Sequence, residues 1–405
     1  MHQTHLKKNW IGLLVLASAC TYSFAEVKIS GAVDQSLDWV DTKTNPTTGG
    51  KPTGTDSISR LGSTLSNYNY LSFSGKEEIG GNLSAIFEMS IKDLSPAAEG
   101  VAMKGYLGHI GLEGDFGKLK IGRQWRPLFT AIAAIDPTQL AATPGFAGAG
   151  KSGTGLAGLA PEPNKSTFTY NLPSPTPGMF IQVQKGMADP DSTTGLKQGE
   201  NHGAYVIFTD GQKFFATYAM HSEKMTAGSA TAPSVFAASI TGTNGTSATL
   251  AGQTLFGYNG LNHVLYGGTT YAGGDTRESS GIAGTYDFGS FKLVGGRVTE
   301  QVKGKEAKLV MNAIGVKIPL MAKLNLGYLY SKADHTRDPS AVNALTSSIH
   351  TSKFSISGNK SLVTYDFSKR TTLYYAYGKQ QLVGDTALGN EFSTSLSALG
   401  LRHTF

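Results

Sequence analysis

Period-two alternation of apolar and polar residues is the main pattern along this chain. In segment 83–91, apolar residues at odd positions alternate with Ser84, Glu88 and Ser90. The pattern recurs in segments 27–38, 324–331 and 372–378. Such alternation is typical of strands with one apolar and one hydrated face. The sequence therefore predicts antiparallel sheet, and long amphipathic helices are not evident.

Turns and loops alternate between these segments. Seven short turn-like breaks lie at 78–81, 114–117, 174–178, 210–212, 287–290, 319–322 and 366–370. Eight longer segments, rich in Gly, Ser, Thr, Pro or charge, lie at about 41–66, 93–101, 126–164, 189–200, 224–277, 302–306, 334–350 and 382–394. Seven turns and eight loops join sixteen strands, with both chain ends on the short-turn side. Segment 261–273 is open to a second interpretation, as a further strand.

An alternating sheet of this size has a physical reason to close. An open sheet in hydrocarbon leaves a row of backbone groups unpaired, at several kcal/mol each. A barrel of about sixteen strands is too wide for its own side chains to fill. We therefore expect an all-β fold, a 16-stranded antiparallel transmembrane barrel with a hydrated lumen.

The first 25 residues resemble an export leader. Lys7 and Lys8 precede an apolar run at 11–19, and Ser23 and Ala25 place small residues at the −3 and −1 positions of a cleavage site. The run is about half of the roughly 20 residues that a membrane-spanning helix needs. The sequence predicts a signal peptide over 1–25 and a mature barrel over 26–405.

Composition excludes several other functions. Cys20, inside the leader, is the only cysteine, so the mature chain has neither disulfides nor thiolate metal sites. Without Lys7 and Lys8, 33 basic residues face 29 acidic ones, a balance too mild for nucleic-acid binding. The histidines have no metal-ligand spacing, and the Gly-rich stretch 148–158 lacks the ending of a phosphate-binding loop. No metal and no cofactor are expected.

Four passages resemble the general trimeric porins of Gram-negative bacteria, especially the beta-proteobacterial type. They are Val-Lys-Ile-Ser-Gly at 27–31, Phe-Ser-Gly-Lys-Glu-Glu-Ile-Gly-Gly-Asn-Leu at 73–83, Gly-Lys-Leu-Lys-Ile-Gly-Arg-Gln at 117–124, and Leu-Gly-Leu-Arg-His-Thr-Phe at 399–405. The likeness runs through most of the mature chain. It implies a passive channel for ions and small hydrophilic solutes, not an enzyme, exported through the periplasm to the outer membrane.

The resemblance also implies partners and a constriction. In the family, the Gly-Arg-Gln passage leads into a long loop that folds inward and narrows the pore, here about 126–164. It implies a homotrimer, in contact with outer-membrane lipid and lipopolysaccharide. The terminal Phe405 resembles the signal that the barrel-assembly machinery recognises; alternatively, it ends an ordinary last strand.

Candidate pore residues come from the resemblance and from strand parity. The resemblance puts Arg123 on a basic wall, with Arg126 at the loop entrance. Parity independently turns Lys118 and Lys120 toward the lumen, but the same parity turns Arg123 outward, so either a bulge or the end of the membrane-embedded stretch must intervene there. The alternative for Arg123 is binding to lipopolysaccharide phosphate or to a neighbouring subunit.

Other candidates belong to the loop and the end strands. Asp136 and Glu162 are the only carboxylates in the expected constriction loop, and either is alternatively a solvated loop charge. Alternation turns Lys28 and Arg402 inward on the first and last strands, as parts of the lumen wall.

The sequence departs from the family pattern at two places. Tyr70 stands where an arginine is common, and Arg60 lies upstream, in an expected loop. The loop motif Pro-Glu-Phe-Gly is only partly matched at 161–163, and Thr169 stands at the position of a frequent basic residue, with Lys165 nearby.

Three alternatives remain open. A barrel enzyme, such as a lipase or protease, needs a Ser/His or Asp/His constellation. The candidate histidines, His202 and His221, flank one short turn, and we expect both on the short-turn side of the barrel. A surface adhesin would use the long loops and is compatible with a pore. A secreted soluble β-protein would also show alternating strands.

Overall fold

The computed structural model describes residues 26–45, 54–65, 69–92, 104–141, 164–190, 197–224, 276–304, 306, 308–336, 353–384 and 391–405. The elements of the barrel wall are β1 (Glu26–Asn45), β2 (Gly54–Gly62), β3 (Tyr70–Gly80), β4 (Leu83–Lys92), β5 (Lys104–Gly114), β6 (Gly117–Gln124), β7 (Asn164–Asn171), β8 (Met179–Gly186), β11 (Asn201–Thr209), β12 (Phe214–Lys224), β13 (Thr276–Asp287), β14 (Lys292–Val302), β15 (Lys308–Met321), β16 (Leu324–Thr336), β17 (Lys353–Asp366), β18 (Thr371–Gly384) and β19 (Glu391–Thr404). A short helix, α2 (Pro127–Ala133), and a small hairpin of β9 (Asp189–Pro190) and β10 (Lys197–Gln198) complete the described elements.

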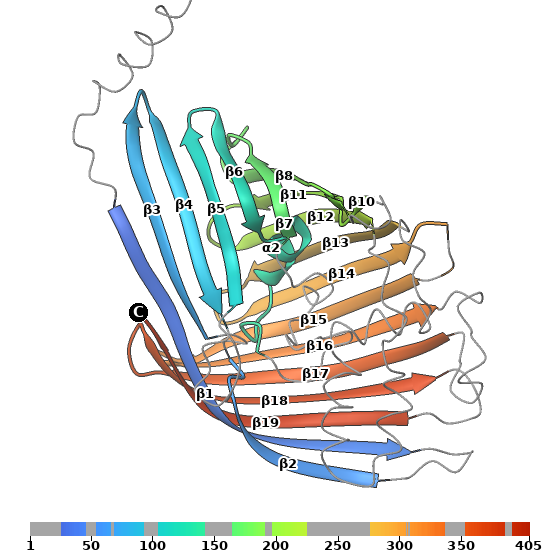
Figure 1. The fold of residues 1–405 in the computed structure, drawn as a ribbon. Helices are drawn as coiled ribbons and strands as arrows, with labels where there is room; N and C mark the ends of the chain where they lie inside the picture. The colour runs from blue at the N-terminus through green and yellow to red at the C-terminus, as the bar shows by residue number, and fades with distance from the viewer. Residues whose placement is uncertain are drawn as a thin grey trace, which may run out of the picture.

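The wall strands form one closed antiparallel barrel (Figure 1). Each strand pairs with its neighbours in sequence, and β1 pairs with β19 from Ala32 opposite Thr404 to Asn45 opposite Glu391. The sheet has 17 strand segments, but β2 and β3 both pair with β1 and occupy a single strand position. The barrel is therefore sixteen-stranded, as the turn count predicts.

Alternation sorts the side chains onto two faces. On β1, Leu37 and Trp39 at odd positions are exposed, whereas Asp34, Ser36 and Asp38 at even positions are buried. The exposed apolar face is the outside of the barrel, where hydrocarbon replaces water. Among the described residues, no helix is both long and apolar enough to cross a bilayer.

Exposed aromatic rings gather at the short-turn end of the barrel. They are Phe116, Phe180, Phe208, Phe214, Tyr286, Phe288, Phe291, Tyr365 and Phe367. Phe288 stacks on Phe291 with ring centroids 4.8 Å apart. Aromatic girdles of this kind mark a membrane interface in transmembrane barrels.

All seven predicted turns join strands of the structure, but the first predicted loop is wrong in extent. Residues 54–62, expected within a loop at 41–66, form β2, and Arg60 lies in that strand opposite Asp38. Outward positions Ser57 and Ser59 are polar, so apolar alternation is missing there. Segment 261–273 lies outside the described residues.

Candidate pore constriction

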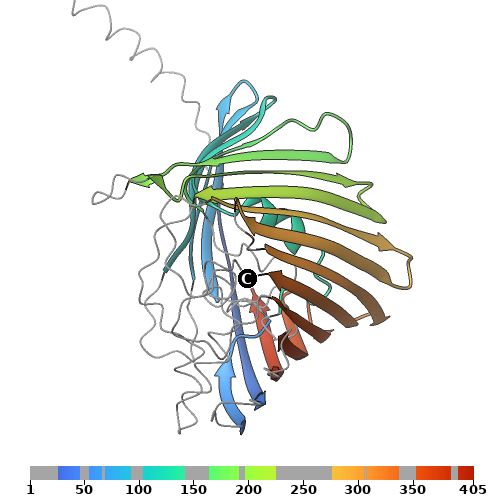
Figure 2. The same ribbon diagram turned by 90° about the vertical axis from the view of Figure 1, so that its right-hand side faces the viewer.

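The segment from Trp125 to Ala141, here called the inner loop, leaves β6 and lies inside the barrel (Figures 1 and 2). Pro127 opens α2 at its first position, where the missing N–H is not needed. Leu128, Ala131 and Ile132, at helical spacing, are almost completely buried. The helix contacts β8, β11, β12 and β13. Its apolar face therefore holds it to one side of the lumen.

Glycines in the wall give the inner loop its room. A Cβ atom added at Gly281 would lie 2.5 Å from Ile132 Cδ1, and one at Gly327 would overlap the carbonyl of Pro137. Both glycines occupy inward positions on their strands, between buried neighbours. Close approach of the loop backbone thus requires a residue without a side chain at Gly327, whereas Gly281 leaves room for the Ile132 side chain.

An alternating chain of charges fixes the start of the inner loop. Arg126 donates to both carboxylate oxygens of Glu223, with Nη1 2.7 Å and Nη2 3.4 Å from them. Arg277 Nη2 lies 2.9 Å from the same carboxylate, and Arg277 Nη1 lies 3.8 Å from Glu300. We call Arg126, Glu223, Arg277 and Glu300 the arginine–glutamate chain. It crosses the inner faces of β12, β13 and β14, with His221 Nε2 3.3 Å from Arg126.

A second ion pair fixes the end of the inner loop. Lys360 Nζ on β17 lies 2.7 Å from Asp136 Oδ2, and both side chains are almost fully buried. The other oxygen of Asp136 accepts hydrogen bonds from the backbone N–H and the hydroxyl of Thr138. A buried carboxylate with these partners is fully compensated. Asp136 thus joins the loop to the wall.

Lysines and glutamates share the inner face of β3 to β6. Glu113 lies between Lys76 Nζ at 3.1 Å and Lys118 Nζ at 2.6 Å, so one carboxylate serves two ammonium groups. Lys120 follows on the same inner face of β6 and is partly buried. The inward orientation that parity predicts for Lys118 and Lys120 therefore agrees with the structure.

Arg123 occupies an irregular part of β6. The pairing of β6 with β7 shifts between Gly122 and Gln124, and Gly122 has a φ of 134°. An irregularity of the kind that one of the two explanations for the parity conflict expects is therefore present. Arg123 is half-buried and donates from Nε to the carbonyl of Tyr106 at 2.7 Å. Its position on a basic pore wall stays a prediction.

The remaining candidates are placed only in part. Glu162 lies outside the described residues, and the backbone alone is described for Arg60 and Lys165, on β2 and β7. Lys28 and Arg402 lie on inward positions, Arg402 opposite Asp34 and Lys28 opposite Ser74. The first and last strands are neighbours, as expected, but Lys28 and Arg402 are not.

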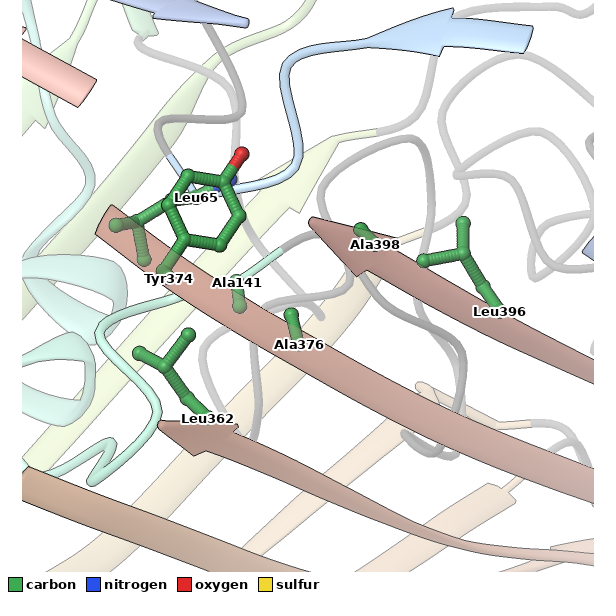
Figure 3. Close-up of a cluster of buried hydrophobic side chains, with 7 residues drawn as sticks. All are labelled: Leu65, Ala141, Leu362, Tyr374, Ala376, Leu396 and Ala398. Carbon is green, nitrogen blue, oxygen red and sulfur yellow. The ribbon is translucent and has the colours of Figure 1, made fainter. Parts of the chain in front are cut away.

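A second inward segment was not expected from the sequence. Between β2 and β3 the chain turns inward, and Leu65 packs beside Tyr374 in a buried cluster that includes Ala141 at the end of the inner loop (Figure 3). Tyr374 donates to Asp34 Oδ1 at 2.7 Å, and Thr64 donates to Asp38 Oδ1 at 3.0 Å. The sequence feature that could have predicted this inward segment is the pair Asp34 and Asp38, two aspartates on the inner face of one strand.

The expected enzyme residues do not form a shared site. His202 is exposed on the outer face of β11, whereas His221 is buried on the inner face of β12. Both lie at the long-loop ends of these strands, so their expected place on the short-turn side is wrong. Within the described parts of the chain, no group of three or more His, Cys, Asp or Glu could hold a metal ion.

The fold and the inner loop define a class of protein: a transmembrane β-barrel with a lumen narrowed from within. Sequence comparison agrees with this class. The chain belongs to the Gram-negative porin family, whose sequence profile matches residues 12–385. It is therefore an outer-membrane channel.

Solved structures of similar fold are porins and outer-membrane proteins. The anion-selective porin of Comamonas acidovorans has a TM-score of 0.65 at 17% identity, covering 94% of this chain and 100% of that one. The outer-membrane channel DcaP of Acinetobacter baumannii has a TM-score of 0.57 at 10% identity, covering 94% and 97%. OmpF of Salmonella typhi, in complex with daunomycin, has a TM-score of 0.52 at 14% identity, covering 94% and 97%. A search of curated protein sequences gave no significant match.

Proposed function

We propose that this protein is a non-enzymatic diffusion channel with a preference for small anions. Diffusion needs only a hydrated gap and a field across it. The inner loop, which we take to continue to about residue 164 as the constriction loop, is held against β11 to β17. Solutes then pass between this loop and the lysine wall of β3 to β6.

The observation that carries the anion preference is the unequal charge around Glu113. Two lysines share this carboxylate, and Lys120 adds a third positive charge on the same face. On the loop side, the arginine–glutamate chain and the pair of Asp136 with Lys360 each balance their own charges. Glu88, on the inner face of β4, offsets part of this charge. We take the remaining net field beside Glu113 to be positive, which raises the local concentration of anions. The anion selectivity of the Comamonas acidovorans porin supports the same direction.

Reversal potential in a salt gradient tests this preference. We expect the reversal potential of the parent protein to lie toward the equilibrium potential of chloride. Lys118→Met combined with Lys120→Met should shift the reversal potential toward the equilibrium potential of the cation, because the gap loses two positive charges. Lys332→Met is the matched control, since Lys332 lies on the outer face and pairs there with Asp334. A cation-selective parent, or a double variant identical to the parent, would contradict the proposal.

Assembly and targeting are part of the proposal. We take residues 1–25 as a signal peptide that directs export through the periplasm, and Phe405 as a signal to the barrel-assembly machinery. A homotrimer in contact with lipid and lipopolysaccharide is supported by the trimer form described for OmpT of Vibrio cholerae. The long loops that an adhesin would use lie largely outside the described residues.

A further inference from the structure

We propose that the lumen holds a binding site for a small multivalent oxyanion of the phosphate type, on the short-turn side of the inner loop. This inference rests on the proposed diffusion function and adds a ligand class to it. A cavity of about 310 Å³ lies between the inner loop and the wall. Ala134, Ile135, Asp136 and Pro137 form its loop side, and β11 to β15 form the rest.

Two lysines of this cavity face each other across neighbouring strands. Lys292 on β14 and Lys317 on β15 are direct partners in the register, and both occupy inward positions. Directly opposite side chains have Cβ atoms about 4.5–5.5 Å apart, and like charges there are destabilising. An anion shared between the two ammonium groups removes this repulsion. Lys213, in the turn after β11, lines the same cavity.

Nearby carboxylates do not neutralise this group of lysines. Asp287 lies 3.5 Å from Lys292, and no described carboxylate forms an ion pair with Lys317. Asp136 is already paired with Lys360. Asp210 accepts the backbone N–H groups of Gln212, Lys213 and Phe214 at 2.8–2.9 Å.

The hydrogen bonds of the Asp210 carboxylate are therefore made within its own turn. The hydrogen bond from the Phe214 N–H, followed by those from Gln212 and Lys213, lowers the pKa of Asp210 below its ordinary value, so it stays charged at neutral pH. Three ammonium groups then face Asp287 and this engaged carboxylate, and the balance in the cavity is positive. A multivalent anion gains most from such a field.

The cavity size suits a transient ligand. A water molecule occupies roughly 30 Å³ in the liquid, so 310 Å³ holds an oxyanion together with several waters. Thr285 adds a hydroxyl to the lining. Lysine binds phosphate as a mobile point charge, without the rigid fork of arginine. Such a site concentrates the anion and releases it, which conduction requires.

Inorganic phosphate is the probe for the test. We expect phosphate to reduce the chloride current of the parent in planar bilayers in a saturable way, and to bind the detergent-solubilised protein in a phosphorus NMR titration. Lys292→Met combined with Lys317→Met should weaken both effects on the order of a hundredfold, because two charge-assisted contacts are lost. Lys292→Arg combined with Lys317→Arg should retain binding, and Lys332→Met is the outer-face control.

The two proposals fail separately. A parent that conducts chloride with anion preference but shows no saturable phosphate effect would overturn the oxyanion site alone. Equal phosphate binding by the parent and the double Met variant would also overturn it, provided that both show the gel mobility of a folded barrel. The NMR titration tests the site even where no current is recorded, whereas cation selectivity of the parent would count against the anion preference of the proposed function.

Discussion

Replacing Glu223 with Gln is expected to release the start of the inner loop and to raise single-channel conductance. Glu223 is the shared partner of Arg126 and Arg277, at 2.7 and 2.9 Å, and both arginines are buried. A neutral amide removes the charge that Arg126 and Arg277 share, and leaves Glu300, 3.8 Å from Arg277, as the remaining carboxylate of the chain. Removing one partner of a buried pair costs about 3–5 kcal/mol, which shifts loop release by roughly a hundredfold to a few thousandfold.

Single-channel recording checks this expectation. The Glu223→Gln channel should show larger and noisier current steps than the parent, because the inner loop leaves the wall. Asp334→Asn serves as the matched control, since its partner Lys332 is half exposed on the outer face and such pairs contribute little. Unchanged current steps in folded Glu223→Gln protein would mean that the arginine–glutamate chain does not hold the loop.

The second large effect is expected at the other end of the inner loop. Lys360→Met removes the ammonium partner of the buried Asp136 carboxylate, and Asp136→Asn removes the negative charge that Lys360 contacts at 2.7 Å. Each single change should loosen the loop by about 3–5 kcal/mol. The double variant should recover most of this loss, because no buried charge remains.

A double-mutant cycle measures this coupling. Thermal loss of the folded-barrel gel mobility and single-channel noise are compared for the parent, the two single variants and the double variant. Additive effects would show that Asp136 and Lys360 act independently and would remove this anchor from the account.

The barrel itself was predictable because its signal is local. Each short turn, such as 287–290, lies between segments whose alternation fixes the inner and outer faces of the strands. Strand β2 was missed for a physical reason: it pairs with the long-loop end of β1, where the outward positions Ser57 and Ser59 need not be apolar. The same rule assigned Lys118 and Lys120 to the inner face, and it left a bulge as one of two explanations for Arg123, where the structure has an irregularity near Gly122.

The loop anchors could not be predicted in the same way. Parity places Lys360 and Glu223 inside the barrel, but their partners depend on where the inner loop lies in three dimensions. Asp136 and Lys360 are 224 residues apart in sequence. The sequence suggested Arg126 and Asp136 as charges of the pore. In the structure each forms a buried ion pair with the barrel wall, Arg126 with Glu223 and Asp136 with Lys360. Their contribution to the field in the gap stays a prediction.

We infer that the space between the inner loop and the lysine wall is a continuous aqueous path. Planar-bilayer recording of the purified, folded protein tests it most directly. We expect stable, ohmic current steps whose conductance rises in proportion to the conductivity of the bathing salt. Folded protein that inserts into the bilayer and adds no conductance would contradict it.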